Sequence, residues 1–298
     1  MDKRKYLIVL WILSLVVFNG CFVAQSKKGT INNTPNPLNR LNSNTVLIAA
    51  HRGGYENDYK DKAPENSVVN IKNAVSKGFD VYETDLQRTK DGVFVIVHDQ
   101  TIERETDGHG EVKNITLAEL KKLKKRYTNG VTSQEPVATF EEFLQHGKNR
   151  ITFKVDMKPG IQAYFKEIVS LVKKHKMMDS VLFRVEYKEA DFFSKYVNEG
   201  NPYSENLLMF MVDSKQQVDF IEKTFSPLSI QVNIGSKNPW AQSLEVIKYA
   251  ASKDILVETH VIGNEKQWGS LVHAGVRMLH SQTPLKTLDY LRSINKHK

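Results

Sequence analysis

Short runs of apolar residues alternate with amphipathic stretches along most of this 298-residue chain. Nine of the runs have the length and the β-branched content of strands: 46–50, 81–86, 93–97, 151–157, 181–185, 207–212, 229–234, 255–260 and 276–280. Between them, helical spacing predicts helices at 67–77, 164–175, 189–198, 214–224, 243–251 and 267–274. Strands that alternate with helices in this way predict βα units and a parallel sheet.

The number of strands suggests how that sheet closes. Eight strands and about 250 folded residues are typical of a (β/α)₈ TIM barrel. The chain offers one strand too many, so we expect one of the nine to be an extra edge strand or no strand at all. Neither an internal repeat nor an interdomain linker interrupts the pattern after residue 42. The sequence therefore predicts one α/β domain over residues 42–298.

The first 41 residues follow a different pattern. Three basic residues and an apolar run of secretory length occupy positions 3–18, which predicts a signal peptide over 1–20. Cys21 directly follows a small residue, and this place resembles a bacterial lipobox. Residues 21–41, rich in Asn, Pro, Ser and Thr, predict a flexible tether. We expect an exported lipoprotein anchored to a membrane through Cys21, in the periplasm or at the cell surface. A plain signal peptide is the alternative.

Charge and cysteine content narrow the function classes. The formal charge is +8, and removal of 1–20, with three basic residues and one acidic residue, leaves +6. The one dense basic run, 121–126, has helical surroundings, so we expect it to form a solvated helix face. Zinc-finger spacing, a P-loop and aromatic-basic motifs are all missing, which argues against nucleic acid, and no feature predicts a protein partner. A single cysteine allows no intrachain disulfide, so a packed core must supply the stability.

Histidine and acidic side chains gather around the first three strands. His51 follows the first strand and His98 follows the third. Glu83 and Asp85 alternate along the second strand, so they project from the same side. Active sites of such barrels lie at the C-terminal strand ends, and buried acids are costly without a cation beside them. These residues therefore predict a catalytic metal site.

The strand at 151–157 adds to this cluster. Lys154, Asp156 and Lys158 share one face, whereas the apolar residues between them take the other. An inward Asp156 can complete a three-carboxylate site, and an inward lysine can hold a phosphate oxygen. Oxygen ligands of this kind predict a hard divalent cation, Ca²⁺ or Mg²⁺.

These segments together resemble the glycerophosphodiester phosphodiesterase family, in its order and at its spacing. The resemblance rests on His51-Arg52-Gly53, Pro64-Glu65-Asn66-Ser67, Glu83-Thr84-Asp85, 89–93, 97–99, Arg104, 106–108 and Gly110, and it continues through 116–123 and 136–143. It implies a (β/α)₈ barrel with a small insertion after the third strand, at about 101–136. It also implies metal-dependent hydrolysis of a small-molecule glycerophosphodiester to glycerol 3-phosphate and an alcohol.

The resemblance implies that His51 and His98 are the general acid and base. The glycerol hydroxyl beside the phosphate would attack phosphorus while one histidine removes its proton and the other protonates the leaving alcohol. The sequence does not decide which histidine plays which part.

The resemblance also assigns binding roles. The metal ligands would be Glu83, Asp85 and Asp156, and the phosphate contacts would be Arg52 and Lys158. At Asp156 the family carries a glutamate. The shorter side chain is expected to change the metal distance or the choice of metal without abolishing binding.

The C-terminal half departs from the family pattern. The family's Trp-Thr-Val-Asn stretch is replaced here by 257–260, and its Thr-Asp-x-Pro ending by 281–284. The leaving group is therefore open, and Glu258 and His260 are either substrate contacts or structural residues. Two alternatives remain at this point, a related enzyme that acts on a phospholipid or inositol phosphodiester and a non-catalytic binding lipoprotein. A membrane-lipid substrate should require an apolar rim at the barrel mouth.

Overall fold

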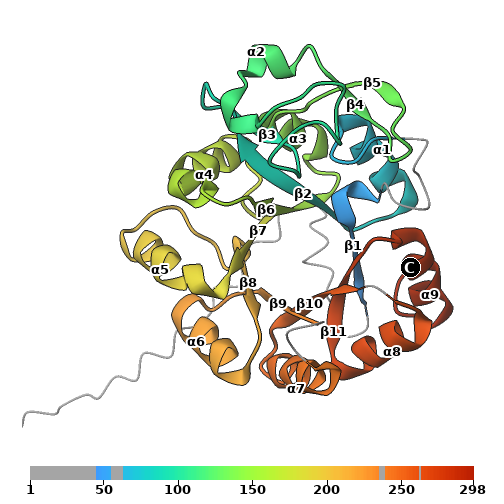
Figure 1. The fold of residues 1–298 in the computed structure, drawn as a ribbon. Coiled ribbons are helices and arrows are strands. Elements are labelled where there is room, and N and C mark those ends of the chain that lie inside the picture. The colour runs from blue at the N-terminus through green and yellow to red at the C-terminus, as the bar shows by residue number, and fades with distance from the viewer. Residues whose placement is uncertain (1–44, 55–62, 235–238, 262) are drawn as a thin grey trace, which may run out of the picture. The chain divides into compact units, whose positions relative to one another are not determined.

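Eight parallel strands close into a barrel within the described part of this computed structural model, residues 45–54, 63–234, 239–261 and 263–298 (Figure 1). Along the chain they are β1 (Leu47–Ala50), β2 (Val81–Arg88), β6 (Thr152–Met157), β7 (Val181–Glu186), β8 (Leu208–Val212), β9 (Ser229–Val232), β10 (Leu256–Val261) and β11 (Val276–Ser281). The last strand, β11, pairs with β1, and β1 also pairs with β2, which closes the ring. The predicted (β/α)₈ barrel is confirmed.

One of the nine predicted strands, the run 93–97, lies outside the parallel barrel and forms β3 (Phe94–Ile96). It runs antiparallel to β2, with Ile96 opposite Leu86. A tight turn joins the two strands, in which Gly92 has a φ of 85° and donates its N–H to the carbonyl of Thr89. A parallel pair needs a crossover of about a dozen residues, so a link this short allows only an antiparallel hairpin. β3 is thus the extra strand that the count required.

Helices cover the outside of the barrel (Figure 1). The six that were predicted are α1 (Val68–Lys77), α4 (Phe165–Lys174), α5 (Ala190–Asn198), α6 (Lys215–Phe225), α7 (Trp240–Ala251) and α8 (Glu265–Ala274). α3 (Phe140–Gly147) begins within the segment 136–143 that shares the family resemblance, and α9 (Pro284–Ser293) was not predicted. Among the described helices, none is both long and apolar enough to span a bilayer. The predicted signal peptide, the tether and Cys21 lie outside the described residues.

The segment after β3 forms the predicted insertion. It contains the short 3₁₀ helix η3 (Val112–Asn114), α2 (Leu117–Leu120), β4 (Lys124–Arg126) and β5 (Thr132–Pro136). Its apolar side chains pack in a small core separate from that of the barrel, formed by Val95, Val97, Ile102, Val112, Leu120 and Val137. The insertion therefore folds over the barrel with a core of its own.

The basic run 121–126 is not a solvated helix face, so that prediction was wrong. α2 ends at Leu120, and the second half of the run is β4. Lys125 is completely buried, with its Nζ 3.1 Å from Oε2 of Glu105. The pattern of charges along the run could not reveal this, because the counter-ion lies 20 residues earlier in the chain.

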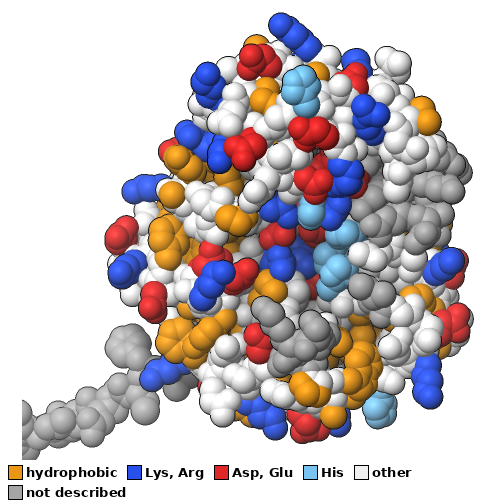
Figure 2. Space-filling view, viewed as in Figure 1, with side chains coloured by type: hydrophobic (Ala, Val, Ile, Leu, Met, Phe, Trp, Pro, Cys, Tyr) orange, Lys and Arg blue, Asp and Glu red, His pale blue; other side chains and the backbone are white. Residues whose placement is uncertain are grey.

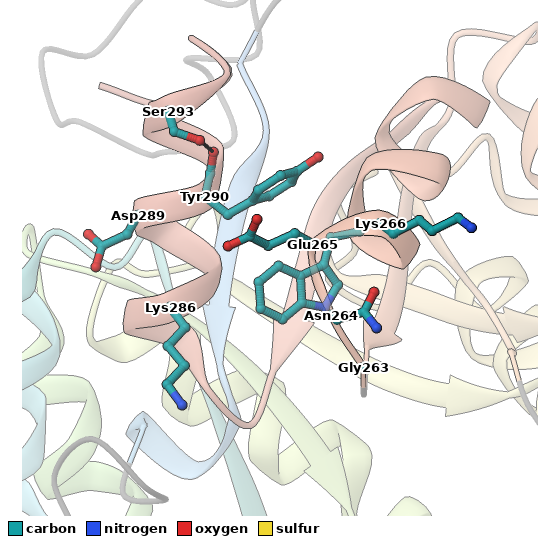
Figure 3. Close-up of a pocket in the computed structure, with 9 residues that line it drawn as sticks. Gly263, Asn264, Glu265, Lys266, Lys286, Asp289, Tyr290 and Ser293 are labelled. Atoms are coloured by element: carbon teal, nitrogen blue, oxygen red, sulfur yellow. Dashed lines mark hydrogen bonds between the residues drawn. The ribbon is translucent and has the colours of Figure 1, made fainter.

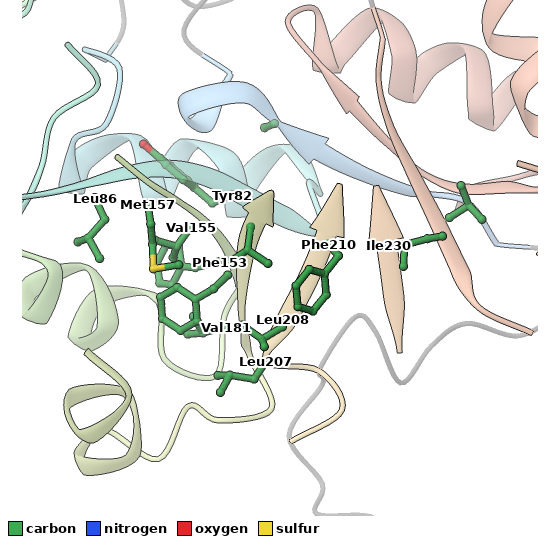
Figure 4. Close-up of a cluster of buried hydrophobic side chains, with 14 of the residues drawn as sticks. Tyr82, Leu86, Phe153, Val155, Met157, Val181, Leu207, Leu208, Phe210 and Ile230 are labelled. Carbon is green, nitrogen blue, oxygen red and sulfur yellow. The ribbon is translucent and has the colours of Figure 1, made fainter. Parts of the chain in front are cut away.

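Alternation along the strands separates two sets of side chains. Outward residues such as Phe153, Val155 and Met157 pack against the helices in the main apolar core (Figure 4). The N-terminal half of the barrel interior is also apolar, filled by Leu47, Ala49, Val81, Leu182, Met209, Leu256 and Met278. The next inward residues toward the C-terminal ends are polar or charged on every one of these strands except β8, where Met211 follows Met209, and this places the site at that mouth.

Candidate active site

Three acidic side chains meet at the C-terminal mouth of the barrel. Glu83 and Asp85 come from β2, and Asp156 comes from β6, where it is in register with Asp85. One oxygen of each lies within 4.8 Å of the others, and Glu83 and Asp85 are almost completely buried. Burial and the neighbouring charge of Glu83 raise the pKa of Asp85. The three predicted metal ligands thus converge, and their hard oxygen donors fit Ca²⁺ or Mg²⁺.

Basic side chains face these carboxylates. The Nζ atom of Lys158 lies 2.7 Å from Asp85 and 3.2 Å from Asp156, and Arg184 donates a hydrogen bond to Asp156 at 2.6 Å. The Nε atom of Arg52 is 3.7 Å from Asp85. These groups balance the acidic charge and can also bind the oxygens of a phosphate. Arg184 was not identified from the sequence, although a charged residue inside the apolar run of β7 was a signal for it.

The His-Arg-Gly sequence forms a tight turn, η2 (His51–Gly53), at the end of β1. Arg52 has a φ of 48°, and its backbone N–H donates to Oε2 of Glu83 at 2.9 Å. Gly53 has a φ of 84°, and a Cβ there would lie 2.3 Å from the ring of Tyr82, so only glycine fits. The turn therefore holds two predicted site residues, His51 and Arg52, against β2.

The segment before α1 positions site residues. Asn66 donates from Nδ2 to Asp85 at 2.9 Å and accepts a hydrogen bond from Thr84 at 2.8 Å. Glu65 accepts two hydrogen bonds from Arg104, at 2.8 and 3.0 Å. Burial by itself raises the pKa of Glu65, but the hydrogen bonds from Arg104 help to lower it overall. In the sequence these residues were noticeable only through the family resemblance.

An acidic neighbour orients His98. Its Nδ1 lies 2.6 Å from Oδ1 of Asp99, whose other oxygen accepts a hydrogen bond from Arg104 at 2.6 Å. Burial alone would raise the pKa of Asp99, but the hydrogen bonds from Arg104 and His98 lower it to about 2. The ionised carboxylate favours a proton on Nδ1 of His98 and leaves Nε2 for proton transfer. Sequence reasoning did not assign this orienting residue.

The structure places His51 in a different cluster from His98. The ring centroid of His51 lies 5.3 Å from the centroids of both His260 and His280, and the latter two rings stack at 4.3 Å. His51 lies close enough to Glu83 to favour the ionised form of that carboxylate, and His98 does the same for Asp85. The two predicted catalytic histidines therefore approach the carboxylates from different parts of the chain.

A buried ion pair lies below this mouth. Glu258 accepts a hydrogen bond from Lys154 at 2.5 Å, and both side chains are completely buried. Lys154 also donates to Gln231 at 3.3 Å and lies 3.2 Å from Nδ1 of His280. The sequence left the roles of Glu258 and His260 open. Glu258 is a structural partner of Lys154. His260, two residues nearer the mouth, is only partly buried.

A cleft of about 370 Å³ opens beside the carboxylates at the ends of β6 and β7. Its walls include Lys158, Arg184, Glu186, Lys188 and Glu189. Figure 2 shows basic, acidic and histidine side chains around a hollow at the centre of this face. Walls of this kind suit a small anionic ligand.

A larger cavity, of about 750 Å³, lies between α8 and α9 (Figure 3). Trp268 and Tyr290 meet there edge to face, with ring centroids 5.7 Å apart. The residues that line it include none of the carboxylates, histidines or phosphate contacts described above. Volume alone therefore does not locate the active site in this barrel.

A profile of the Glycerophosphoryl diester phosphodiesterase family matches residues 51–282, most of the chain. The chain belongs to this family. The family comprises phosphoric diester hydrolases, and the matched region contains every site residue predicted from the sequence. The resemblance stated on motifs alone is thereby confirmed.

Curated relatives and solved structures extend this family assignment. A glycerophosphodiester phosphodiesterase of Caldanaerobacter subterraneus is 32% identical over 142 residues, 46% of this chain and 56% of that protein. One of Bacillus subtilis is 24% identical over 301 aligned positions, 95% of this chain and 96% of the relative. The match thus spans little more than half of the first relative but nearly all of the second.

Two solved structures show the same fold. A glycerophosphoryl diester phosphodiesterase from Parabacteroides distasonis superposes with a TM-score of 0.72 at 22% identity, over 89% of this chain and 93% of that one. An Oleispira antarctica phosphodiesterase, in complex with the product sn-glycerol-3-phosphate, gives 0.67 at 21% identity, over 84% and 98%. At these identities the likeness is one of fold.

Proposed function

We propose that this member of the family hydrolyses glycerophosphodiesters to glycerol 3-phosphate and an alcohol, with Ca²⁺ or Mg²⁺ as cofactor. The observation that supports this most directly is the convergence of three carboxylates with Lys158 and Arg184 at one barrel mouth. The names of the curated relatives agree with it, as does the product bound to the Oleispira antarctica enzyme.

The binding residues follow from the carboxylate cluster. Glu83, Asp85 and Asp156 would hold the divalent cation, which when bound neutralises phosphate charge and lowers the pKa of a coordinated hydroxyl. The ammonium group of Lys158 contacts Asp85 and Asp156. When these carboxylates hold the cation, Lys158 would be free to bind a phosphate oxygen in their place. Arg52, on the turn after β1, supplies a second positive charge from the other side of β2.

The two histidines would carry the protons. The free glycerol hydroxyl attacks phosphorus, and one histidine takes its proton. The other donates a proton to the leaving alcohol as the bond between its oxygen and phosphorus breaks. Water then opens the resulting cyclic phosphate with the two histidines in exchanged roles, which gives glycerol 3-phosphate. The contact between His98 and Asp99 supports a part for His98, because a carboxylate at Nδ1 fixes the orientation of the ring.

The cleft favours a water-soluble diester over a membrane lipid. An interfacial enzyme should present an apolar rim, whereas six of the twelve described residues that line this cleft are charged and four, Met157, Pro159, Val185 and Met211, are apolar. We therefore place the phospholipid or inositol phosphodiester second.

An assay of the purified full-length chain on glycerophosphocholine, glycerophosphoethanolamine and glycerophosphoinositol tests the proposal. We expect glycerol 3-phosphate to be released, EDTA to abolish the reaction, and added Ca²⁺ or Mg²⁺ to restore it. Absence of glycerol 3-phosphate from all three substrates would overturn the proposed activity and leave two alternatives, the enzyme that acts on a phospholipid or inositol phosphodiester and the non-catalytic lipoprotein. Turnover that persists after exhaustive chelation would overturn the metal requirement alone.

We also propose that the chain is an exported lipoprotein anchored through Cys21, with support from the sequence alone. The wild-type chain should then partition with membranes, and Cys21→Ser should remain an uncleaved precursor or become soluble. Metabolic labelling with a fatty acid provides the measurement. Label in Cys21→Ser at the wild-type level would contradict the anchor.

A further inference from the structure

Three histidines from adjacent strands converge beside the carboxylate cluster. His51 follows β1, His280 lies on β11, and His260 lies on β10 opposite His280 in the register. One ring nitrogen of each lies within 4.8 Å of the others. A tetrahedral ion with bonds of about 2.0–2.1 Å to nitrogen sets its ligand atoms about 3.4 Å apart, so these atoms must come up to about 1.4 Å closer together. The stacked rings of His260 and His280 must also rotate so that both lone pairs point at one ion.

Two of these rings are suited to act as ligands. His280 is buried in the barrel mouth, and the ring of His260 stacks on it with ring centroids 4.3 Å apart. A neutral imidazole offers a lone pair to a metal. The Nε2 atom of His260 is buried and has no hydrogen-bond partner among the described residues.

The surroundings of His280 provide an outer-shell carboxylate. Its Nδ1 lies 3.5 Å from Oε1 of Glu258 and 3.2 Å from Nζ of Lys154, so it can either donate to the first or accept from the second. In the first arrangement Nε2 presents its lone pair, as in metal sites where a carboxylate holds the far nitrogen of a ligating histidine. Nε2 also faces Oε2 of Glu83 at 3.4 Å, which places a fourth ligand within reach.

We propose that His51, His260 and His280 form a second cation site, beside the carboxylate site and selective for a transition ion such as Zn²⁺. Nitrogen donors favour Zn²⁺ and its neighbours, whereas Ca²⁺ and Mg²⁺ prefer the oxygen donors of the other site. Binding requires the proton of His280 to be on Nδ1, from which it is donated in a hydrogen bond to Glu258, so that the lone pair of Nε2 is available to the ion. The site shares His51 with the proposed reaction, so an ion bound there would occupy one of the two proposed proton carriers, but the binding of the ion can be measured without that reaction.

Direct metal binding to the full-length chain, stripped of ions by chelation and dialysis, tests this site. Zn²⁺ should bind in competition with a chromophoric chelator, and Co²⁺ should give the visible absorption of a four-coordinate ion. His260→Ala and His280→Ala should each weaken Zn²⁺ binding by more than about 100-fold, and Glu258→Gln by about 10- to 100-fold. Circular dichroism identifies any variant that fails to fold.

Two controls separate this site from its neighbours. His273→Asn removes an exposed histidine of α8 and should leave Zn²⁺ affinity unchanged. Asp156→Asn should weaken Ca²⁺ or Mg²⁺ binding while Zn²⁺ still binds, so loss of the carboxylate site does not imply loss of this one. Zn²⁺ affinity in folded His260→Ala equal to that of the wild type would overturn the proposal. Absence of Zn²⁺ binding to the wild-type chain would overturn it as well.

Discussion

The two ends of the barrel interior are built from the same strands and yet differ completely in chemistry. At the N-terminal end the inward residues of β2, β7 and β10 are Val81, Leu182 and Leu256, all buried and apolar. Two residues further along the same strands, the inward residues are Glu83, Arg184 and Glu258. One step of the strand repeat therefore separates a hydrophobic plug from a charged site.

This difference indicates how the barrel divides its tasks. The apolar end gains stability from burial and needs no partner for any side chain. The charged end is costly to bury and is tolerated because nearly every group there has a counter-charge, as Lys154 has Glu258 and Asp85 has Lys158. Substitutions at the two ends should therefore fail in different ways, which the following variants test.

The largest effect is expected at the charged end, on rate. His98→Ala should lower kcat by about 10²- to 10⁴-fold, because it removes a positioned proton donor or acceptor. Its melting temperature should change little, since the side chain is 31% exposed. His109→Ala, at an exposed histidine of the insertion, is the matched control and should keep the wild-type kcat. A wild-type kcat in His98→Ala would contradict the role of His98 in proton transfer.

A substrate with an activated phenol as leaving group sharpens this test. Such a group needs little protonation, so it should rescue whichever of His51→Ala and His98→Ala lacks the general acid and leave the other slow. Equal rescue of both, or of neither, would show that the histidines orient metal or substrate instead.

Deeper in the charged end, substitutions in the pair of Lys154 and Glu258 should lower the stability of the protein. Lys154→Met leaves a buried carboxylate without its cation and should cost about 3–5 kcal/mol of unfolding free energy. The double variant Lys154→Met/Glu258→Leu should recover much of this loss, because no buried charge remains. Urea unfolding measures both. If the double variant were as unstable as Lys154→Met, the loss of unfolding free energy would come from altered packing and not from an unpaired buried charge.

At the apolar end, Leu182→Ala should lower stability by about 2–5 kcal/mol through the cavity it leaves. The folded variant should keep its kcat, because Leu182 lies a full step below the charged residues. Val131→Ala, at a side chain that is 57% exposed, is the control and should change stability by less than about 0.5 kcal/mol. If kcat fell in Leu182→Ala as much as in His98→Ala, the apolar end would not serve stability alone, and the difference between the two ends would be contradicted.

The smallest effect is expected in the acid stability of the charged end. The pKa of Asp99 falls from its ordinary 3.8 to about 2, so its contribution to stability is fully present above pH 4 and is lost as the pH falls through 2. The stability difference between the wild type and Asp99→Asn should thus be constant above pH 4 and shrink below it. Thermal unfolding between pH 7 and 2 measures this difference. A difference that grows toward low pH would contradict the assignment.

Much of this molecule follows from local patterns. Alternation along β6 was enough to place Asp156 inward and Phe153 outward, and helical spacing with Ser67 before it and Gly78 after it was enough to place α1. The carboxylate trio followed from the same alternation. Side chains whose partners are distant in sequence, such as Arg184 and His280, were missed, although each is a charged or titratable residue in an apolar strand.

By itself, then, the sequence determined the eight barrel strands, most of the helices around them and the inward face of each strand, because these depend on residues within one turn or one strand repeat. Only the tertiary structure decided which residues meet at the same height of the barrel. Lys154 finds Glu258 104 residues later, and His280 comes to lie beside Glu83. Such contacts depend on the closure of β1 onto β11 and on the register between parallel strands, neither of which is specified by the residues of any one strand.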